Sequence, residues 1–72
     1  MDETQKQLHT LLDYWIAHNS AHIKEFRDWA DKVASSSAEV AQQLQAAATK
    51  MAAVSTELTK ARLALSKSKE IH

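Results

Sequence analysis

The sequence contains no cysteine, no glycine and no proline. Without cysteine, disulfides, thiolate metal sites and a cysteine nucleophile are all excluded. Glycine and proline supply most tight turns and helix stops, so a chain with neither can form few turns. Gly-rich phosphate loops and dinucleotide-binding motifs are excluded by the same absence. The sequence therefore predicts an all-α fold with very few connections.

An excess of charge of one sign is also absent, and so are long apolar runs. The nine basic and nine acidic residues cancel, so no global field draws the protein to nucleic acid or to anionic lipid. No apolar stretch approaches the roughly 20 residues of a membrane span. The first residues, MDETQKQ, are acidic and polar, where a secretory signal would be basic and then apolar. We expect a cytoplasmic protein with no nucleic-acid partner and no membrane partner.

Apolar residues recur at alternating steps of four and three in each half of the chain, which is the spacing of a helix that faces a partner helix. In the first half the repeat consists of Leu8, Leu12, Trp15, Asn19, His22, Phe26, Trp29 and Val33. In the second half it consists of Val40, Leu44, Ala47, Met51, Val54, Leu58, Ala61 and Leu65. Four further residues widen the first stripe to the breadth of a bundle helix, namely Leu11, Ile16, Ile23 and Ala30.

The first helix has a recognisable start. Asp2 with Gln5 fits a capping box, so this helix is expected over residues 3–34. An alternative is a helix break near residues 18–20, where Asn or Ser could cap a new helix and give a three-helix bundle.

The serine cluster marks the turn. Ser36 with Glu39 fits a second capping box, which predicts a turn at 35–37 and a second helix over 38–68. Two helices of similar length joined by so short a turn must lie antiparallel. We therefore expect residues 1–72 to form one domain, an antiparallel helical hairpin.

A single hairpin covers each apolar stripe on one side only. Because burying an exposed Leu, Phe or Met is worth roughly 1.5–3 kcal/mol, we expect two copies to form a homodimeric four-helix bundle. The orientation of the two hairpins is left open, and another protein partner remains an alternative. The residues expected in the core and interface are Leu8, Leu12, Trp15, Asn19, Phe26, Trp29, Val40, Leu44, Met51, Val54, Leu58 and Leu65.

Two histidines of the first helix are candidates for binding a transition metal. His18 and His22 are four residues apart, which places two imidazoles on one helical face. Glu25 lies one turn further and is a candidate third ligand. Imidazole suits nickel, zinc and cobalt as well as copper, so the metal is not specified. A symmetric dimer with this face near its axis would bring four imidazoles together.

The same residues also have a structural interpretation. His22 and Asn19 could form a buried polar layer, hydrogen-bonded to each other, to Thr49 or to their symmetry mates, and so fix the helix register of an adaptor domain. A third interpretation is a pH-sensitive contact, because imidazole titrates near pH ~6.5. The sequence leaves these three interpretations open.

Catalytic motifs are not apparent, so the predicted function is non-enzymatic. There is no His-Glu-x-x-His zinc signature. Di-iron carboxylate bundles use Glu-x-x-His, whereas His22 and Glu25 stand in the reversed order. The predicted protein is a small self-associating helical module that binds a metal or acts as an interaction domain.

A resemblance to a known family rests on the part of the first helix that holds the tryptophans and histidines. The residues concerned are Tyr14-Trp15-Ile16-Ala17-His18-Asn19-Ser20-Ala21-His22, followed by Glu25-Phe26 and Trp29-Ala30. They resemble a small bacterial and archaeal helical family of unknown function with a Trp-Ile-x-His-Asn-x-x-His-x-x-Glu-Phe-x-x-Trp-Ala core. Members of that family occur alone or beside small nickel-chaperone-like proteins. The resemblance implies a role in metal handling for His18, His22 and Glu25.

Overall fold

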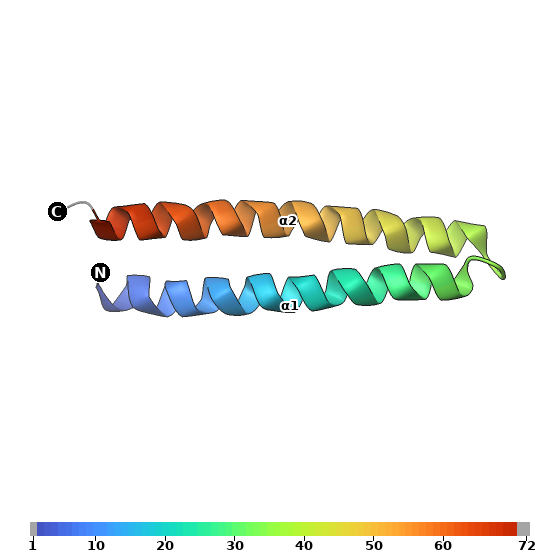
Figure 1. Ribbon diagram of the computed structural model, residues 1–72, viewed down its shortest axis with the longest axis horizontal. Coiled ribbons are helices and arrows are strands. Elements are labelled where there is room, and N and C mark those ends of the chain that lie inside the picture. The colour runs from blue at the N-terminus through green and yellow to red at the C-terminus, as the bar shows by residue number, and fades with distance from the viewer. Residues whose placement is uncertain (1, 71–72) are drawn as a thin grey trace.

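The computed structural model describes residues 2–70 as two helices that lie side by side and antiparallel (Figure 1). Helix α1 comprises Glu3–Val33 and helix α2 comprises Ala38–Glu70. The predicted all-α helical hairpin is therefore confirmed. Helix α1 runs unbroken through residues 18–20, so the alternative of a three-helix bundle is wrong. Within the described part of the chain, neither helix offers an apolar stretch that could span a membrane.

Helix α1 begins at the predicted capping box. The Gln5 amide donates to the Asp2 carboxylate at 2.8 Å, and the Asp2 amide donates to the Gln5 side-chain oxygen at 3.2 Å. Each bond satisfies a backbone N–H that the first helical turn leaves without a partner. The entry to α1 is thus specified locally by two residues.

The turn differs from the prediction by one residue. Ser37 caps α2, because its hydroxyl accepts from the Val40 amide at 3.2 Å. The Ser36 hydroxyl instead donates to the Val33 carbonyl at 3.2 Å, and the Ser36 and Ser37 amides bond the same carbonyl. The predicted capping box of Ser36 with Glu39 is wrong, because the Ser36 hydroxyl bonds the end of α1 and Ser37 directly precedes the first residue of α2, Ala38.

The seam between the helices follows a heptad repeat in which every second member is small or medium in size. Buried and half-buried residues of α1 recur at steps of four and three: Leu12, Ile16, Asn19, Ile23, Phe26, Ala30 and Val33. Those of α2 do the same: Ala41, Leu44, Ala48, Met51, Ser55, Leu58 and Leu65. We assign heptad position d to Leu12 and Leu44 and position a to Ile16 and Ala41, and the other letters follow from these.

The predicted stripes therefore divide into two rows. Position d of α1 and α2 was placed correctly in the seam by the sequence pattern, as at Leu12 and Leu65, which are buried. The large residues at position g, such as Trp15 and Trp29, lie outside the seam and are exposed. The neighbouring seam positions are occupied by smaller residues such as Ala30, which is buried. Two helices approach closely only where the facing side chains are small, so indole rings are displaced to the flank.

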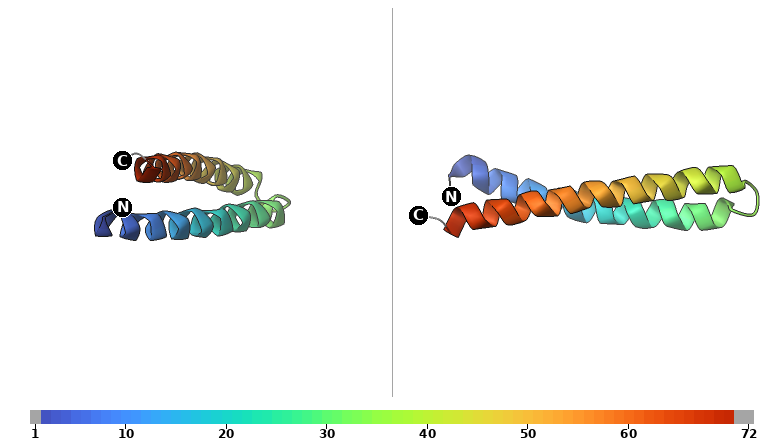
Figure 2. Two further views of the ribbon diagram at one scale, coloured as in Figure 1. Left: turned by 60° about the vertical axis from the view of Figure 1, so that its left-hand side comes forward. Right: turned by 90° about the horizontal axis from the view of Figure 1, so that it is seen from above.

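An ion pair between the helices indicates their register. The Arg62 guanidinium of α2 contacts the Asp13 carboxylate of α1. Residues whose numbers sum to about 74 then lie at the same height, which places position a of one helix opposite position d of the other. In this register Asn19 lies opposite Ser55, near the middle of the hairpin. Viewed from above, the helices cross at a shallow angle (Figure 2).

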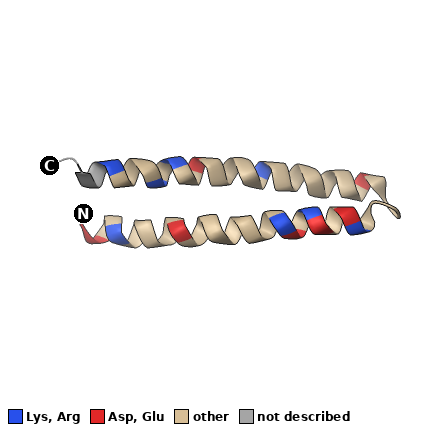
Figure 3. Cartoon of the chain, viewed as in Figure 1, with Lys and Arg blue, Asp and Glu red and all other residues tan. Residues whose placement is uncertain are grey.

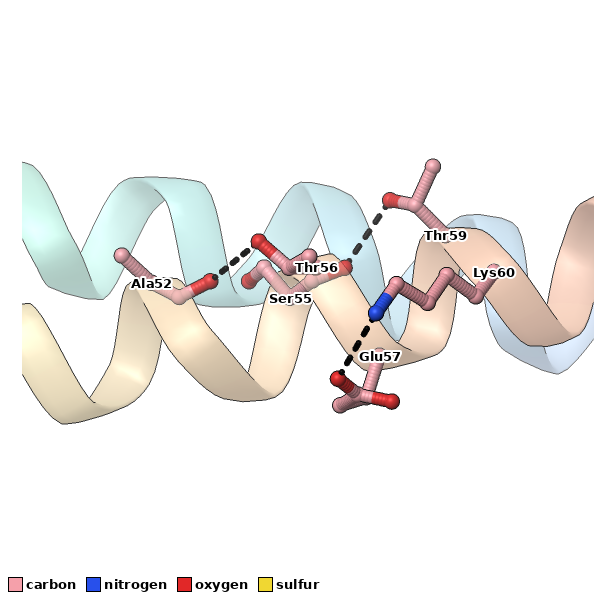
Figure 4. A network of polar contacts seen from close by, with 6 residues as sticks. All are labelled: Ala52, Ser55, Thr56, Glu57, Thr59 and Lys60. Carbon is pink, nitrogen blue, oxygen red and sulfur yellow. Dashed lines mark hydrogen bonds and ion pairs between the residues drawn. The ribbon is translucent and has the colours of Figure 1, made fainter.

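The middle of the seam contains a polar group without a partner. The Ser55 hydroxyl is buried and makes no hydrogen bond, although the Ser55 carbonyl accepts from the Thr59 hydroxyl at 2.9 Å. Thr56 in the next position donates to the Ala52 carbonyl at 3.1 Å (Figure 4). Burying an unsatisfied hydroxyl costs about 1–3 kcal/mol. Ser55 is therefore a site at which the hairpin loses stability.

We expect Ser55→Ala to raise the free energy of unfolding by roughly 1–2 kcal/mol, measured by urea denaturation at fixed protein concentration. Part of this gain is the better helix propensity of alanine, worth about 0.5 kcal/mol. Ser20→Ala is the matched control, because Ser20 is exposed within α1 and gains only the propensity contribution. Equal gains in the two variants would contradict a desolvation cost at Ser55.

Candidate histidine site and apolar face

Four rings stack along one face of α1 at intervals of one turn. The ring centroids of Tyr14 and His18 are 5.4 Å apart and stacked, and those of His18 and His22 are 4.4 Å apart and edge to face. The His22 ring is stacked on Phe26 at 5.9 Å. Tyr14 and Phe26 stand one turn outside the predicted histidine pair, and their i, i+4 spacing from the histidines is the sequence signal for these stacks. These stacks restrict the rotamers of both imidazoles.

The two imidazoles point their Nε2 atoms at each other. The distance between Nε2 of His18 and Nε2 of His22 is 2.9 Å, so one ring donates and the other accepts. The Glu25 carboxylate lies 3.3 Å from Nδ1 of His22. A carboxylate accepts, so this contact places the His22 proton on Nδ1 and leaves its Nε2 lone pair free. His18 is then the ring that donates from Nε2.

The spacing of the two nitrogens suits a metal ion. Two nitrogens bound at about 2.0–2.1 Å with a right angle at the metal lie about 2.9 Å apart, whereas a tetrahedral angle separates them by about 3.3 Å. The hydrogen-bonded nitrogens are 2.9 Å apart, which equals the spacing of neighbouring positions on an octahedral or square-planar ion, and the rings must turn for their lone pairs to converge on such an ion. For both Nε2 atoms to bind an ion, only His18 must release its Nε2 proton. This proton can move to Nδ1 of the same ring, so the pair loses no proton overall.

The predicted third ligand, Glu25, takes a different position. Its carboxylate contacts Nδ1 of His22, on the side of the ring away from His18. Among the residues that the structure describes, no group of three or more histidine or acidic side chains is arranged to hold an ion. Within one chain Glu25 contacts Nδ1 of His22, and the Nε2 atoms of His18 and His22 face each other.

The polar layer predicted for the seam does not form within one hairpin. Asn19 lies in the seam and is half-buried, but His22 lies on its flank and bonds His18. The Thr49 hydroxyl, an alternative partner, donates to the Gln45 carbonyl at 3.1 Å. Within one hairpin His22 and Asn19 do not pair, because Ile23 occupies the seam position next to His22, and the layer formed with symmetry mates stays a prediction.

The histidine site borders an exposed apolar surface. Eight large hydrophobic residues of the described chain are exposed, and six of them occupy positions g and c. Position g of both helices lies on the same side of an antiparallel pair. We call this surface the apolar face, and it consists of Leu8, Leu11, Trp15, Trp29, Val40 and Val54. The other two exposed residues, Tyr14 and Leu63, occupy positions f and b, behind the helices.

The opposite flank of the hairpin is polar. Position e of α1 is occupied by Lys6, Asp13, Ser20 and Arg27, and position e of α2 by small or polar residues. Along α1 the charges gather toward the two ends, and residues 14–23 carry none (Figure 3). The histidine pair thus occupies the uncharged middle of α1, beside the apolar face.

The fold and the site define a class of protein, a two-helix hairpin that presents a histidine pair next to an unpartnered apolar surface. The chain belongs to a family described as Domain of unknown function (DUF8180), whose model matches residues 8–65. The predicted kinship with a small helical family of unknown function is thereby confirmed. No curated protein and no solved structure matches this chain.

The contact between Glu25 and His22 predicts a tautomer. Under alkaline conditions, where the imidazoles are neutral, we expect His22 to be protonated mainly on Nδ1 in long-range ¹H–¹⁵N NMR spectra. Glu25→Ala removes a bond worth roughly 0.5–1 kcal/mol, so the tautomer ratio of His22 should fall about two- to fivefold.

Asp31→Ala is the control for this experiment, because it removes another exposed carboxylate of α1. It should leave the His22 tautomer ratio unchanged. A proton found mainly on Nε2 of His22 in the unsubstituted protein would contradict the assignment.

Proposed function

We propose that this protein is a non-enzymatic, self-associating helical module in which two hairpins pack their apolar faces together as a four-helix bundle. The observation that supports this proposal most directly is the concentration of exposed large hydrophobic residues on one flank. Apolar patches of this kind mark interaction sites on soluble proteins. A second copy of the chain offers an uncharged apolar surface of the same shape.

The surface area of the hairpin supports self-association as well. A compact monomer of 8.1 kDa exposes about 4,500 Å², whereas this hairpin exposes 5390 Å². The excess of about 900 Å² compares with the roughly 800 Å² that each partner buries in a standard interface. The radius of gyration, 16.4 Å, also exceeds the value of about 11 Å for a compact domain of this length.

A second candidate function is the binding of a divalent transition metal such as nickel, zinc or cobalt. It is supported by the 2.9 Å separation of the His18 and His22 Nε2 atoms and by the contact of Glu25 with Nδ1 of His22. Ligating histidines commonly bond a carboxylate through their other nitrogen, which fixes the ring orientation. Metal binding and self-association are compatible, because the site lies at the edge of the apolar face.

Self-association is tested by a matched pair of substitutions on α2. Val54 and Leu63 are both exposed, at 49% and 56%, but only Val54 belongs to the apolar face. We expect Val54→Glu to weaken the dimer at least about 100-fold, since each copy loses roughly 1.5 kcal/mol of apolar burial. Leu63→Glu should leave the dimer unchanged. Sedimentation equilibrium measures both dissociation constants.

A wild-type protein that remains monomeric at a concentration of about 100 μM, equivalent to less than roughly 5.5 kcal/mol of association energy, would contradict the proposal. Equal weakening by the two substitutions would also contradict it, because the interface would then not be the apolar face.

Metal binding is tested by titration of the purified protein with nickel or cobalt. We expect a dissociation constant below about 10 μM, which corresponds to roughly 7 kcal/mol. The double substitution His18→Ala with His22→Ala should abolish this binding. His9→Ala is the matched control, because His9 lies on the same helix and contacts Asp13 at 3.5 Å. Weaker binding by the wild type, or equal loss in the control, would exclude the histidine pair as the site.

A further inference from the structure

The histidine pair of one chain supplies two ligands, and a transition metal held by a protein normally takes three or more protein ligands or completes its shell with water. No third histidine or acidic ligand is in place within the described part of one hairpin. The site borders the apolar face, so a second copy packed on that face is the nearest source of a further ligand. The following inference rests on the proposed self-association.

Two symmetric packings of the apolar faces are possible. A two-fold axis across the hairpin places each α1 against the α1 of the other copy. This packing sets large residues against large ones, such as Trp15 and Trp29, and small ones against small ones, such as Ala47 and Ala61. A two-fold axis along the hairpin places each α1 against α2 of the other copy. Large residues then meet small ones, which is the arrangement that fills space best.

The register of the hairpin determines which residues face each other in the second packing. Rotation about an axis along the hairpin leaves every residue at the same height along that axis. A residue of α1 therefore lies opposite a residue of the partner's α2 when their numbers add up to about 74. This is the register indicated by the Arg62–Asp13 pair within one hairpin. Trp15 then lies between the partner's Val54 and the partner's Ala61.

Position c, at the border of the apolar face, is complementary in this packing. His18 is at the height of the partner's Glu57, and Glu25 is at the height of the partner's Lys50. Leu11 is likewise at the height of the partner's Ala64. Each of these pairs joins a base to an acid or an apolar group to an apolar group, so no like charges meet along the border.

We propose that Glu57 of the partner subunit is the third ligand of a divalent transition metal held by His18 and His22, so that one dimer contains two equivalent sites. Two imidazoles and one carboxylate on one side of the ion leave the remaining positions to water. This ligand set agrees with the nearly right angle implied by the 2.9 Å separation of the nitrogens.

Glu57 is available for this role. Its side chain is 72% exposed, and its carboxylate contacts Lys60 of the same helix at 3.2 Å (Figure 4). A surface ion pair of this kind is worth at most about 1 kcal/mol, so exchange of the Lys60 ammonium for a metal ion is inexpensive. Glu25 keeps its contact with Nδ1 of His22 and orients that ring.

The number of metal ions per dimer tests the proposal. We expect isothermal titration of the full-length dimer with Co²⁺ to give two ions per dimer. Glu57→Gln should weaken Co²⁺ binding at least about tenfold, with no change in the dimer dissociation constant measured by sedimentation. Glu39→Gln, which removes an exposed carboxylate from the first turn of the same helix, is the matched control and should bind Co²⁺ normally.

A mixing experiment tests whether the carboxylate comes from the partner. The His18→Ala, His22→Ala variant and the Glu57→Gln variant each lack a complete site as homodimers. Random mixing makes half of the dimers mixed, and each mixed dimer holds one complete site, so about one quarter of the wild-type capacity for tight Co²⁺ binding should return.

Several outcomes would overturn the composite site. One ion per dimer would indicate four imidazoles around one metal and hence the other packing. Normal Co²⁺ binding by Glu57→Gln, or no recovery on mixing, would exclude the partner's carboxylate. In all these cases the dimer and the histidine pair are retained. A monomeric wild-type protein would instead refute the proposed function itself.

Discussion

A hairpin of two helices can cover only one narrow seam on each helix, and the other features of this protein depend on that constraint. Residues of small or medium size, Ala30, Ala41 and Ala48 among them, occupy most of the a positions and let the helices approach. The described chain accordingly has only four buried hydrophobic residues, and two of these are alanines. The bulky residues of α1, above all Trp15 and Trp29, lie beside the seam and generate the apolar face.

The position of the histidine pair depends on the same constraint. His18 and His22 are held by ring stacking with their neighbours along α1, in the uncharged middle of that helix and at the border of the apolar face. If a metal ion takes ligands from two copies, metal affinity and dimer affinity are linked, because each raises the other by the same factor. A small interaction module would then respond to metal concentration without any change of fold.

Much of the architecture was predicted from the sequence, and the errors of the prediction concern single residues. The Asp2–Gln5 capping box, the serine turn and the two helices were all predictable, because each depends on contacts within a few residues. The cap of α2 was predicted at Ser36 and lies at Ser37, because the Ser36 hydroxyl bonds the Val33 carbonyl at the end of α1 instead. The contact of the Glu25 carboxylate with Nδ1 of His22 was not predicted, because it depends on side-chain rotamers and not on spacing along the helix alone.

The sequence by itself determined that the chain is two antiparallel helices with a repeat of steps of four and three, since these properties depend on local propensity and on periodicity. It did not determine which of two adjacent rows faces the other helix, because the apolar stripe of α1 is wide enough to contain both. Only the tertiary structure decided this, by the physical requirement that closely packed helices meet through their smaller side chains. That choice separates His22 from Asn19 and brings it to the surface beside His18.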